Sequence, residues 1–340
     1  MTDLHGSAMS ARRKRWLATG LVAATAALLT ACAKNAPQDT LDPAGPFARE
    51  IDGLFRPVFW IAVAVFVLVE GLLLVALIRF RHRPGRGVPV QVHGNKRLEI
   101  GWTIAPALVL AVIAVPTVGT IFSLDRKPAG ALEISVTAHQ WWWEVEYPSL
   151  QVLTANEVHI PVGEPAYVTM TSQDVIHSFW VPRLAGKQDV VPGRTTHLSI
   201  QADAPGRYEG QCAEYCGASH ANMQFLVLAD DRAQFDAWVQ GQLRKPPPPS
   251  PDVLQTLGAA GCGGCHIIEG IQGAAGRIGP SLSHFGSRTT FAGSIFPNTP
   301  EEVAAWLDDP PGRKPGADMP DLGLSREEID ALVAYLEGLD

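Results

Sequence analysis

The chain is organised around a stretch of thirteen residues, Gln211-Cys212-Ala213-Glu214-Tyr215-Cys216-Gly217-Ala218-Ser219-His220-Ala221-Asn222-Met223. Two thiols are followed by an imidazole and then by a thioether. These are soft ligands, which suit copper in electron transfer and do not suit calcium or magnesium. A blue-type site with one copper needs one Cys, one Met and two His, so the second Cys requires a second metal ion or a disulfide. Two thiolates in one loop can bridge two copper ions, and His177 is the candidate for the missing imidazole.

A disulfide between Cys212 and Cys216 is the simpler alternative, because closely spaced Cys pairs outside the cytosol are often bridged. The added imidazoles and thioether favour copper. Cys-x-Glu-x-Cys-x3-His-x2-Met, after an upstream His-Ser-Phe-x-Val-Pro, resembles the binuclear copper (CuA) site of cytochrome c oxidase subunit II. The resemblance implies two copper ions held by six residues: His177, Cys212, Glu214 through its backbone carbonyl, Cys216, His220 and Met223.

The same resemblance implies two further roles. The Glu214 carboxylate is expected to reach a magnesium or manganese ion at the interface with subunit I, and carboxylate is a suitable ligand for such a hard cation. A plain surface charge is the alternative for Glu214. In the aromatic stretch that begins at His139, Trp141 matches the tryptophan through which electrons reach CuA, while Trp142 stands where a tyrosine is common. Packing in the core and at the membrane interface is the alternative for these tryptophans.

Residues 125–245 are typical of an all-β domain outside the cytoplasm. Short β-rich runs are separated by Gly, Pro and Asn, which predicts an antiparallel sandwich or barrel. The resemblance implies a cupredoxin-like Greek-key barrel, with His177 and the Cys loop meeting at one end on loops. His159 and His197 lie in strand-like runs and are expected to be structural. We expect strands at 132–138, 143–147, 157–161, 166–172, 195–202, 206–211 and 223–229.

The N-terminus has the pattern of an export signal. A basic cluster at 12–15 precedes an apolar run from Trp16 to Thr30, and small residues follow. Leu29-Thr30-Ala31-Cys32 resembles a bacterial lipoprotein box, which implies that residues 1–31 are removed and that Cys32 is acylated and held by membrane lipid. An ordinary signal peptide or an uncleaved anchor is the alternative.

Two apolar runs in the segment 32–124 are long enough to cross a bilayer. Residues 57–78 contain one charge, Glu70, and residues 102–124 contain none, and about 20 apolar residues span the hydrocarbon. Pro106 and Pro116 are tolerated between packed membrane helices. The loop between the runs carries several Arg and Lys residues, so the positive-inside rule predicts that it is cytoplasmic. We therefore expect a multi-pass protein of the bacterial inner membrane, with everything after Leu124 on the periplasmic side.

Two carboxylates lie in or beside these runs. For Glu70 we favour a hydrogen bond in a helix interface over a role in a polar path. Glu99 opens the stretch Glu99-Ile100-Gly101-Trp102, which resembles the start of the family's second helix. There the matching glutamate lies at the mouth of a proton channel into subunit I. A simple interfacial charge is the alternative for Glu99.

A proline-rich linker at 246–252 separates a third domain, residues 253–340. The run of prolines in the linker cannot form a helix and predicts a semi-rigid polyproline spacer. Behind it, Cys262-Gly263-Gly264-Cys265-His266 is the attachment signature of one covalent haem c. Both thiols would bond the haem vinyl groups, and His266 would be an axial ligand of the iron.

Met319 is the only methionine after the haem motif and is the candidate for the second axial ligand, with His284 as its competitor. Met/His ligation raises the haem potential. The Met-Pro pair resembles the ligand loop of an all-α class I cytochrome c domain. Capping signals at Thr299 and Ser325 predict helices on either side of this loop, and the last helix should pack its apolar face against the first helix of the domain.

The whole pattern resembles subunit II of a proton-pumping cytochrome c oxidase with a fused cytochrome c domain. Electrons would enter at haem c, pass to CuA and leave to subunit I, where dioxygen is reduced to water. Other oxidase subunits, and a cytochrome bc complex or small cytochrome c as donor, would be its partners. The formal charge of −7 argues against nucleic acid as a binding partner. The alternatives are a CuA-containing nitric oxide reductase subunit and a membrane copper-delivery protein; a quinol oxidase subunit shares the fold but lacks the Cys and Met ligands.

Overall fold

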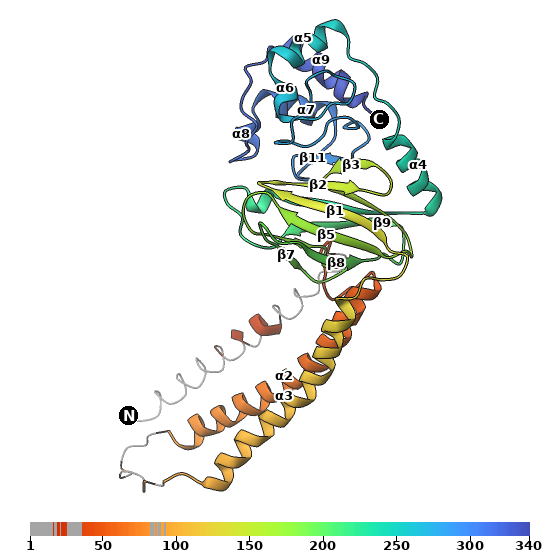
Figure 1. The fold of residues 1–340 in the computed structure, drawn as a ribbon. Helices are drawn as coiled ribbons and strands as arrows, with labels where there is room; N and C mark the ends of the chain where they lie inside the picture. The colour runs from red at the N-terminus through yellow and green to blue at the C-terminus, as the bar shows by residue number, and fades with distance from the viewer. Residues whose placement is uncertain are drawn as a thin grey trace, which may run out of the picture. The chain divides into compact units, whose positions relative to one another are not determined.

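The computed structural model describes residues 36–81, 85, 87, 90–91 and 93–340, together with 16, 19–20 and 22–25. The chain divides into two units, residues 1–39 and 40–340. In the first unit the described residues from 16 to 25 are helical, and Cys32, like most of the expected signal segment, lies outside the described residues. The second unit contains a pair of long helices, a β sandwich and a C-terminal helical domain (Figure 1).

The two long helices are α2 (Pro46–Arg79) and α3 (Lys96–Leu124), and both are long and apolar enough to cross a membrane. Both extend beyond the apolar runs expected at 57–78 and 102–124. The extra turns of α2 begin against the β sandwich, where Ala48 N donates to Leu184 O at 3.1 Å. Gly45 allows this approach, since a Cβ there would lie 2.0 Å from Gln201 O. The side chain of Asn95 caps α3 by accepting from two of its first N–H groups.

The β domain consists of two five-stranded sheets with a shared apolar core. One sheet has the order β3-β2-β1-β5-β8 and the other β4-β10-β9-β6-β7. Trp143, Phe179 and Phe225 pack edge-to-face or stacked at its centre. The strand bounds are β1 Leu132–His139, β2 Trp142–Tyr147, β3 Val152–Ala155, β4 Glu157–Pro161, β5 Ala166–Ser172, β6 His177–Trp180, β7 Gln188–Val190, β8 Thr196–Ile200, β9 Gly206–Cys212 and β10 Gln224–Asp230.

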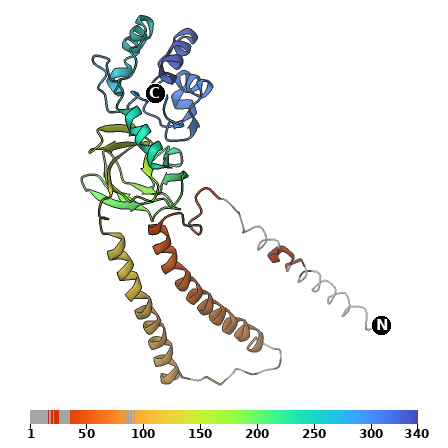
Figure 2. The same ribbon diagram turned by 90° about the vertical axis from the view of Figure 1, so that its right-hand side faces the viewer.

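The cupredoxin-like fold class is confirmed, with corrections in detail. The sheets are mixed rather than antiparallel, because β1 pairs with β5 and β4 with β10 in parallel across crossover connections. The short strands β3, β6 and β7 were not expected, and His177 is the first residue of β6 rather than part of a loop. The domain also ends in a helix, α4 (Arg232–Gln242), which contacts β3, β4 and β10 and lies beside the sandwich in Figure 2.

The C-terminal domain has its own core and is built from α5 (Pro251–Ala259), α6 (Cys262–Cys265), α7 (Pro300–Asp308), α8 (Pro310–Arg313) and α9 (Arg326–Glu337). Its expected helical class is confirmed, with the addition of two short strands, β11 (Thr290–Phe291) and β12 (Phe296–Pro297). Helix α9 contacts α5 and α7, as its apolar face predicted. Pro251 and Asp252, expected in the linker, form the first turn of α5, because Ser250 caps it and Pro at this position needs no N–H partner.

Candidate metal centre and adjoining pocket

The side chains of the Cys loop converge where β9 ends and β10 begins. The antiparallel pairing of these strands brings Cys212 beside Met223, with Cys212 N donating to Met223 O at 2.9 Å. The Sγ atoms of Cys212 and Cys216 are 3.7 Å apart. This separation is far longer than the roughly 2.05 Å of a disulfide. Both cysteines are free and buried, so the two thiols face one another across a space that a metal ion can occupy.

His177 and His220 flank this pair of sulfurs. His177 Nδ1 lies 3.8 Å from Cys212 Sγ, and His220 Nδ1 lies 3.6 Å from Cys216 Sγ. Strand β6 pairs with β9, which aligns His177 with the end of β9. A single 3₁₀ turn, His220–Asn222, turns the chain back so that Met223 Sδ lies 3.9 Å from Cys216 Sγ.

One backbone oxygen completes the set. Cys212 Sγ lies 3.2 Å from Glu214 O, so this carbonyl points at the sulfur pair. The atoms therefore comprise two thiol sulfurs, two imidazole nitrogens, a thioether sulfur and a carbonyl oxygen. The sulfur and imidazole donors suit copper, and their number fits two copper ions rather than one.

Asp174 is a functional residue that the sequence reasoning missed. Its Oδ1 lies 2.8 Å from His177 Nε2, so the imidazole places its proton on Nε2 and leaves the Nδ1 lone pair facing Cys212. Gln140 N donates to Oδ2 of the same carboxylate at 2.6 Å. The Asp-x-x-His spacing could have indicated this residue in the sequence. Metal-bound histidines usually donate their other ring N–H to a carboxylate or a carbonyl, which orients the ring.

The thiols influence each other's protonation. Hydrogen bonding from the Cys216 thiol, followed by that with His177, lowers the pKa of Cys212. The neighbouring thiol of Cys212 and then burial raise the pKa of Cys216. Cys212 is therefore the thiol of the pair that loses its proton more readily, and a bound metal would favour the thiolate form of both because a thiolate is the metal ligand.

Trp141 lies directly against the Cys loop. Its Nε1 donates to Cys216 O at 3.0 Å, and Gln140 Nε2 donates to the same carbonyl at 2.6 Å. Gly217 (φ +114°) permits this contact, since a Cβ there would lie 3.0 Å from Trp141 Cζ2. Of the three tryptophans, Trp143 is in the sandwich core and Trp142 is buried, with its Nε1 donating to Ile278 O of the C-terminal domain.

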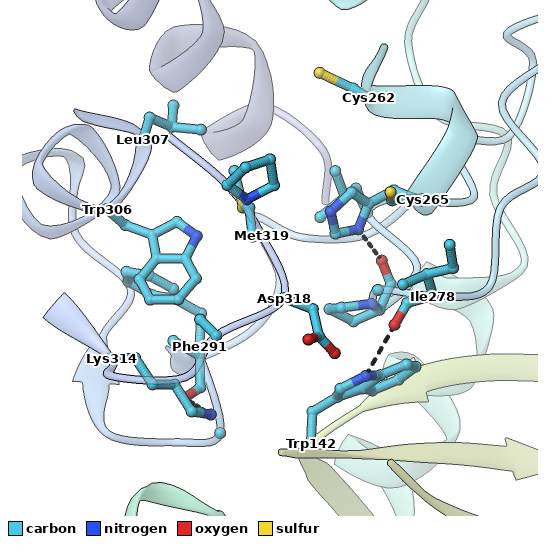
Figure 3. Close-up of a pocket in the computed structure, with 18 of the residues that line it drawn as sticks. Trp142, Cys262, Cys265, Ile278, Phe291, Trp306, Leu307, Lys314, Asp318 and Met319 are labelled. Atoms are coloured by element: carbon cyan, nitrogen blue, oxygen red, sulfur yellow. Dashed lines mark hydrogen bonds between the residues drawn. The ribbon is translucent and has the colours of Figure 1, made fainter. Parts of the chain in front are cut away.

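A largely apolar pocket between the β domain and the C-terminal domain is lined in part by Trp141 and Trp142 (Figure 3). Cys262, Cys265, His266 and Met319 all line it. His266 Nδ1 lies 2.7 Å from Pro280 O, so this nitrogen donates and Nε2 keeps its lone pair. Burial lowers the pKa of His266, which favours the neutral imidazole that ligates iron. Gly279 leaves room for the ring, since a Cβ there would lie 2.4 Å from His266 Cε1.

The pocket accommodates the chemistry of a covalent haem. It offers two thiols, an imidazole nitrogen and a thioether, surrounded by apolar side chains such as Phe285, Phe291 and Leu307. His284, the competitor of Met319, does not line this pocket. It is buried with its Nδ1 3.0 Å from Asp340 O.

The side chains of the remaining sequence-predicted residues do not join either set of converging ligand atoms. The Glu214 side chain is exposed on the Cys loop, 3.8 Å from Lys187 Nζ. Glu99 lies in the first turn of α3, and Glu70 lies in α2 with its side chain exposed. His159 and His197 occur in β4 and β8, where His159 stacks on Trp238 and His197 contacts Asp125.

Three family models match the chain. The periplasmic domain of cytochrome c oxidase subunit II matches residues 149–229, the transmembrane domain of the same subunit matches residues 33–119, and cytochrome c matches residues 255–340. Together they match most of the long helices, strands β3 to β10 of the β domain and nearly all of the C-terminal domain.

Curated relatives agree with these matches. Cytochrome c oxidase subunit 2 of Alkalihalophilus pseudofirmus is 39% identical over 324 residues, covering 92% of this chain and 93% of that protein. The protein of the same name from Bacillus subtilis is 34% identical and covers 96% and 98%. Quinol oxidase subunit 2 of Bacillus cereus is 33% identical but covers 59% of this chain and 71% of that protein. From the long helices to the C-terminal domain, this chain belongs to the cytochrome c oxidase subunit II family.

Proposed function

We propose that the chain accepts electrons at a covalently bound haem c, passes them to a binuclear CuA centre and delivers them to subunit I. There dioxygen is reduced to water, coupled to proton pumping. The chain is a membrane-bound oxidase subunit II that carries copper and cytochrome c domains and works with the other oxidase subunits.

One observation carries the copper assignment. Two thiol sulfurs lie 3.7 Å apart, and each of two imidazole nitrogens and a thioether sulfur lies within 3.9 Å of one of them. A single copper would leave part of this set unused. We propose His177, Cys212, Cys216, His220, Met223 and the carbonyl of Glu214 as the ligands of two copper ions, between which one electron is shared when the site is loaded.

The haem assignment rests on the pocket beside Trp141 and Trp142. We propose thioether bonds to Cys262 and Cys265, with His266 and Met319 as axial ligands. The role of the protein is to hold the imidazole in one tautomer through Pro280 O and to exclude water with apolar side chains. Trp141 is the residue through which electrons reach copper, supported by its hydrogen bond to Cys216 O.

Further assignments follow from the family. The exposed Glu214 carboxylate would ligate magnesium or manganese with groups of subunit I, and Glu99 would lie at the mouth of a proton channel. A cytochrome bc complex or a small cytochrome c would be the donor. Residues 1–31 would be a signal peptide, Cys32 the lipidated N-terminus, and residues 125–245 and 253–340 the periplasmic domains of a bacterial inner-membrane protein.

Metal content and spectra test the central proposal. The full chain, produced in a host that matures c-type haem and supplied with copper, should contain two coppers per covalent haem. Its electron spin resonance spectrum should show a copper pair that shares one electron. Cys216→Ser should abolish that signal and leave the haem spectrum unchanged. One copper or none, with Cys212 and Cys216 bridged in copper-replete protein, would contradict the CuA assignment.

A further inference from the structure

Lys314 differs from the other described lysines because it alone is buried, with 4% of its surface exposed. It follows α8 in the C-terminal domain. Its Nζ donates to Trp141 O of the β domain at 2.6 Å and to Ala292 O at 2.8 Å. Within the described part of the chain no carboxylate forms an ion pair with it.

This arrangement leaves the ammonium incompletely satisfied. An ammonium group has three N–H donors, and the two carbonyls accept only two of them. Carbonyl dipoles also do not neutralise a full charge, and a buried charge is costly unless it is paired. The burial accordingly lowers the pKa of Lys314 to about 7. A buried cation with a spare donor and no ion-pair partner among the described residues indicates that an anion belongs beside it.

The position of Lys314 identifies the chemistry of that anion. Its side chain lines the same pocket as Cys262, Cys265 and Met319. In Figure 3, Cys262 and Cys265 lie at the end of the pocket remote from Lys314. A haem c carries its thioether links on one edge of the macrocycle and its propionate carboxylates on the opposite edge. Thiols at one end therefore direct a carboxylate towards the other.

We propose that the Lys314 ammonium binds a propionate of the haem and so joins the haem edge to the main chain of Trp141. This inference rests on the proposed haem site. Because Trp141 Nε1 donates to Cys216 O, hydrogen bonds then connect the propionate through Lys314 and Trp141 to the copper loop. Lys314 is thus a positioning residue, which fixes the haem relative to the tryptophan through which its electron leaves.

The test removes the positive charge of Lys314, with and without its hydrogen-bond donors, in the full chain assembled in its oxidase. Lys314→Met removes both, and Lys314→Gln keeps amide donors but removes the charge. Lys245→Met is the matched control, because it removes one exposed positive charge just before the linker. The reduction potential of the haem is measured by spectroelectrochemistry. Both Lys314 variants should have a lower potential, since losing a nearby positive charge stabilises the ferric haem, whereas Lys245→Met should match the wild type.

A second readout addresses the propionate directly. With ¹³C-labelled propionates, the carboxylate bands in the infrared redox difference spectrum should shift in both Lys314 variants and not in Lys245→Met. If fully haem-loaded Lys314→Gln keeps both the wild-type potential and the wild-type bands, the inference is wrong and Lys314 serves only the two carbonyls. If Lys314→Met loads haem poorly, Lys314→Gln supplies the measurement. Failure of the proposed function is distinguishable, because the wild-type chain itself would then lack covalent haem.

Discussion

At the scale of single residues, the Cys loop at 211–223 depends on groups that are not among its proposed metal ligands. Asp174 holds His177 by Nε2, and Gln140 and Trp141 both donate to Cys216 O. The first contact fixes the imidazole of one proposed ligand, and the other two hold the backbone of another. A metal site is tight when its ligands are held in place by such neighbours, because little orientation is lost on binding.

Asp174→Asn tests this dependence. The amide keeps the shape of the side chain but removes its charge, and it can donate to His177 Nε2 and favour the wrong tautomer. Loss of such a contact typically lowers metal affinity about 10–100-fold. Copper titration followed by the spectrum of the bound pair should show this decrease. Asp236→Asn, which disrupts an exposed pair with Arg232, is the control and should bind copper as the wild type does. Equal affinities in the two variants would contradict an orienting role for Asp174.

At the scale of elements, short capping motifs set where helices begin in the C-terminal domain, called here the haem domain after its proposed haem pocket. Ser325 accepts from Glu328 N while the Glu328 side chain accepts from Ser325 N, so a complete capping box starts α9. Helix α9 contributes Ile329, Leu332 and Leu336 to the core of that domain.

Ser325→Ala should therefore lower the free energy of unfolding of the haem domain by about 1 kcal/mol, the typical cost of losing an N-cap. Guanidinium unfolding of the haem-loaded chain, followed by haem absorbance, measures it. Ser325→Thr, which keeps an accepting hydroxyl, should restore most of the loss. A Thr variant as unstable as the Ala variant would show that the cap is not the cause.

Glu157 connects two elements of different domains. It lies in β4, is 1% exposed, and its Oε1 accepts from the N–H and hydroxyl groups of Thr289 and Thr290 in the haem domain. Burial alone would raise the pKa of Glu157, but the nearby imidazole of His159 and hydrogen bonds from Thr289 outweigh it and lower the pKa. A carboxylate with a lowered folded pKa stabilises fully above its ordinary pKa, and this contribution is lost as pH falls through the folded value.

Glu157→Gln should weaken this contact by about 2 kcal/mol, the scale of hydrogen bonds to a charged group. Amide hydrogen exchange at Thr289 and Thr290 measures the effect and should be faster in the variant. In the wild type, protection should fall as the pH drops below about 4.3, the ordinary glutamate value, and the variant should lack this acid step. An acid step that persists in Glu157→Gln would assign it to another carboxylate.

At the scale of the whole molecule, the sequence predicted the parts better than their contacts. The membrane helices, the β domain and the cytochrome domain could each be recognised, because apolar length, strand alternation and Cys-x-x-Cys-His are local signals. The parallel pairing of β1 with β5, the strand position of His177 and the linkage of Glu157 to Thr289 could not. These three features depend on contacts between residues far apart in the sequence, so no local sequence pattern predicts them.

Those contacts change the expected behaviour of the linker. A proline-rich spacer by itself predicts a tethered domain that searches for its acceptor at high effective concentration. The structure instead has buried interdomain bonds, from Lys314 to Trp141 O and from Ser219 Oγ to Pro315 O at 2.6 Å. Buried and charge-assisted contacts of this kind hold the haem domain against the β domain rather than leaving it to diffuse.

A docked haem domain makes a kinetic prediction. After a rapid reduction of haem c, electron transfer to copper within the chain should be independent of solvent viscosity and of salt, because no domain search precedes it. Transient absorbance in buffers of graded glycerol and salt measures the rate. Glu157→Gln combined with Lys314→Gln should loosen the contact and introduce a viscosity dependence, while the single control Lys245→Met should not. A wild-type rate that falls in proportion to viscosity would instead mean that the linker lets the haem domain move between turnovers, with the buried contacts formed only in part of the cycle.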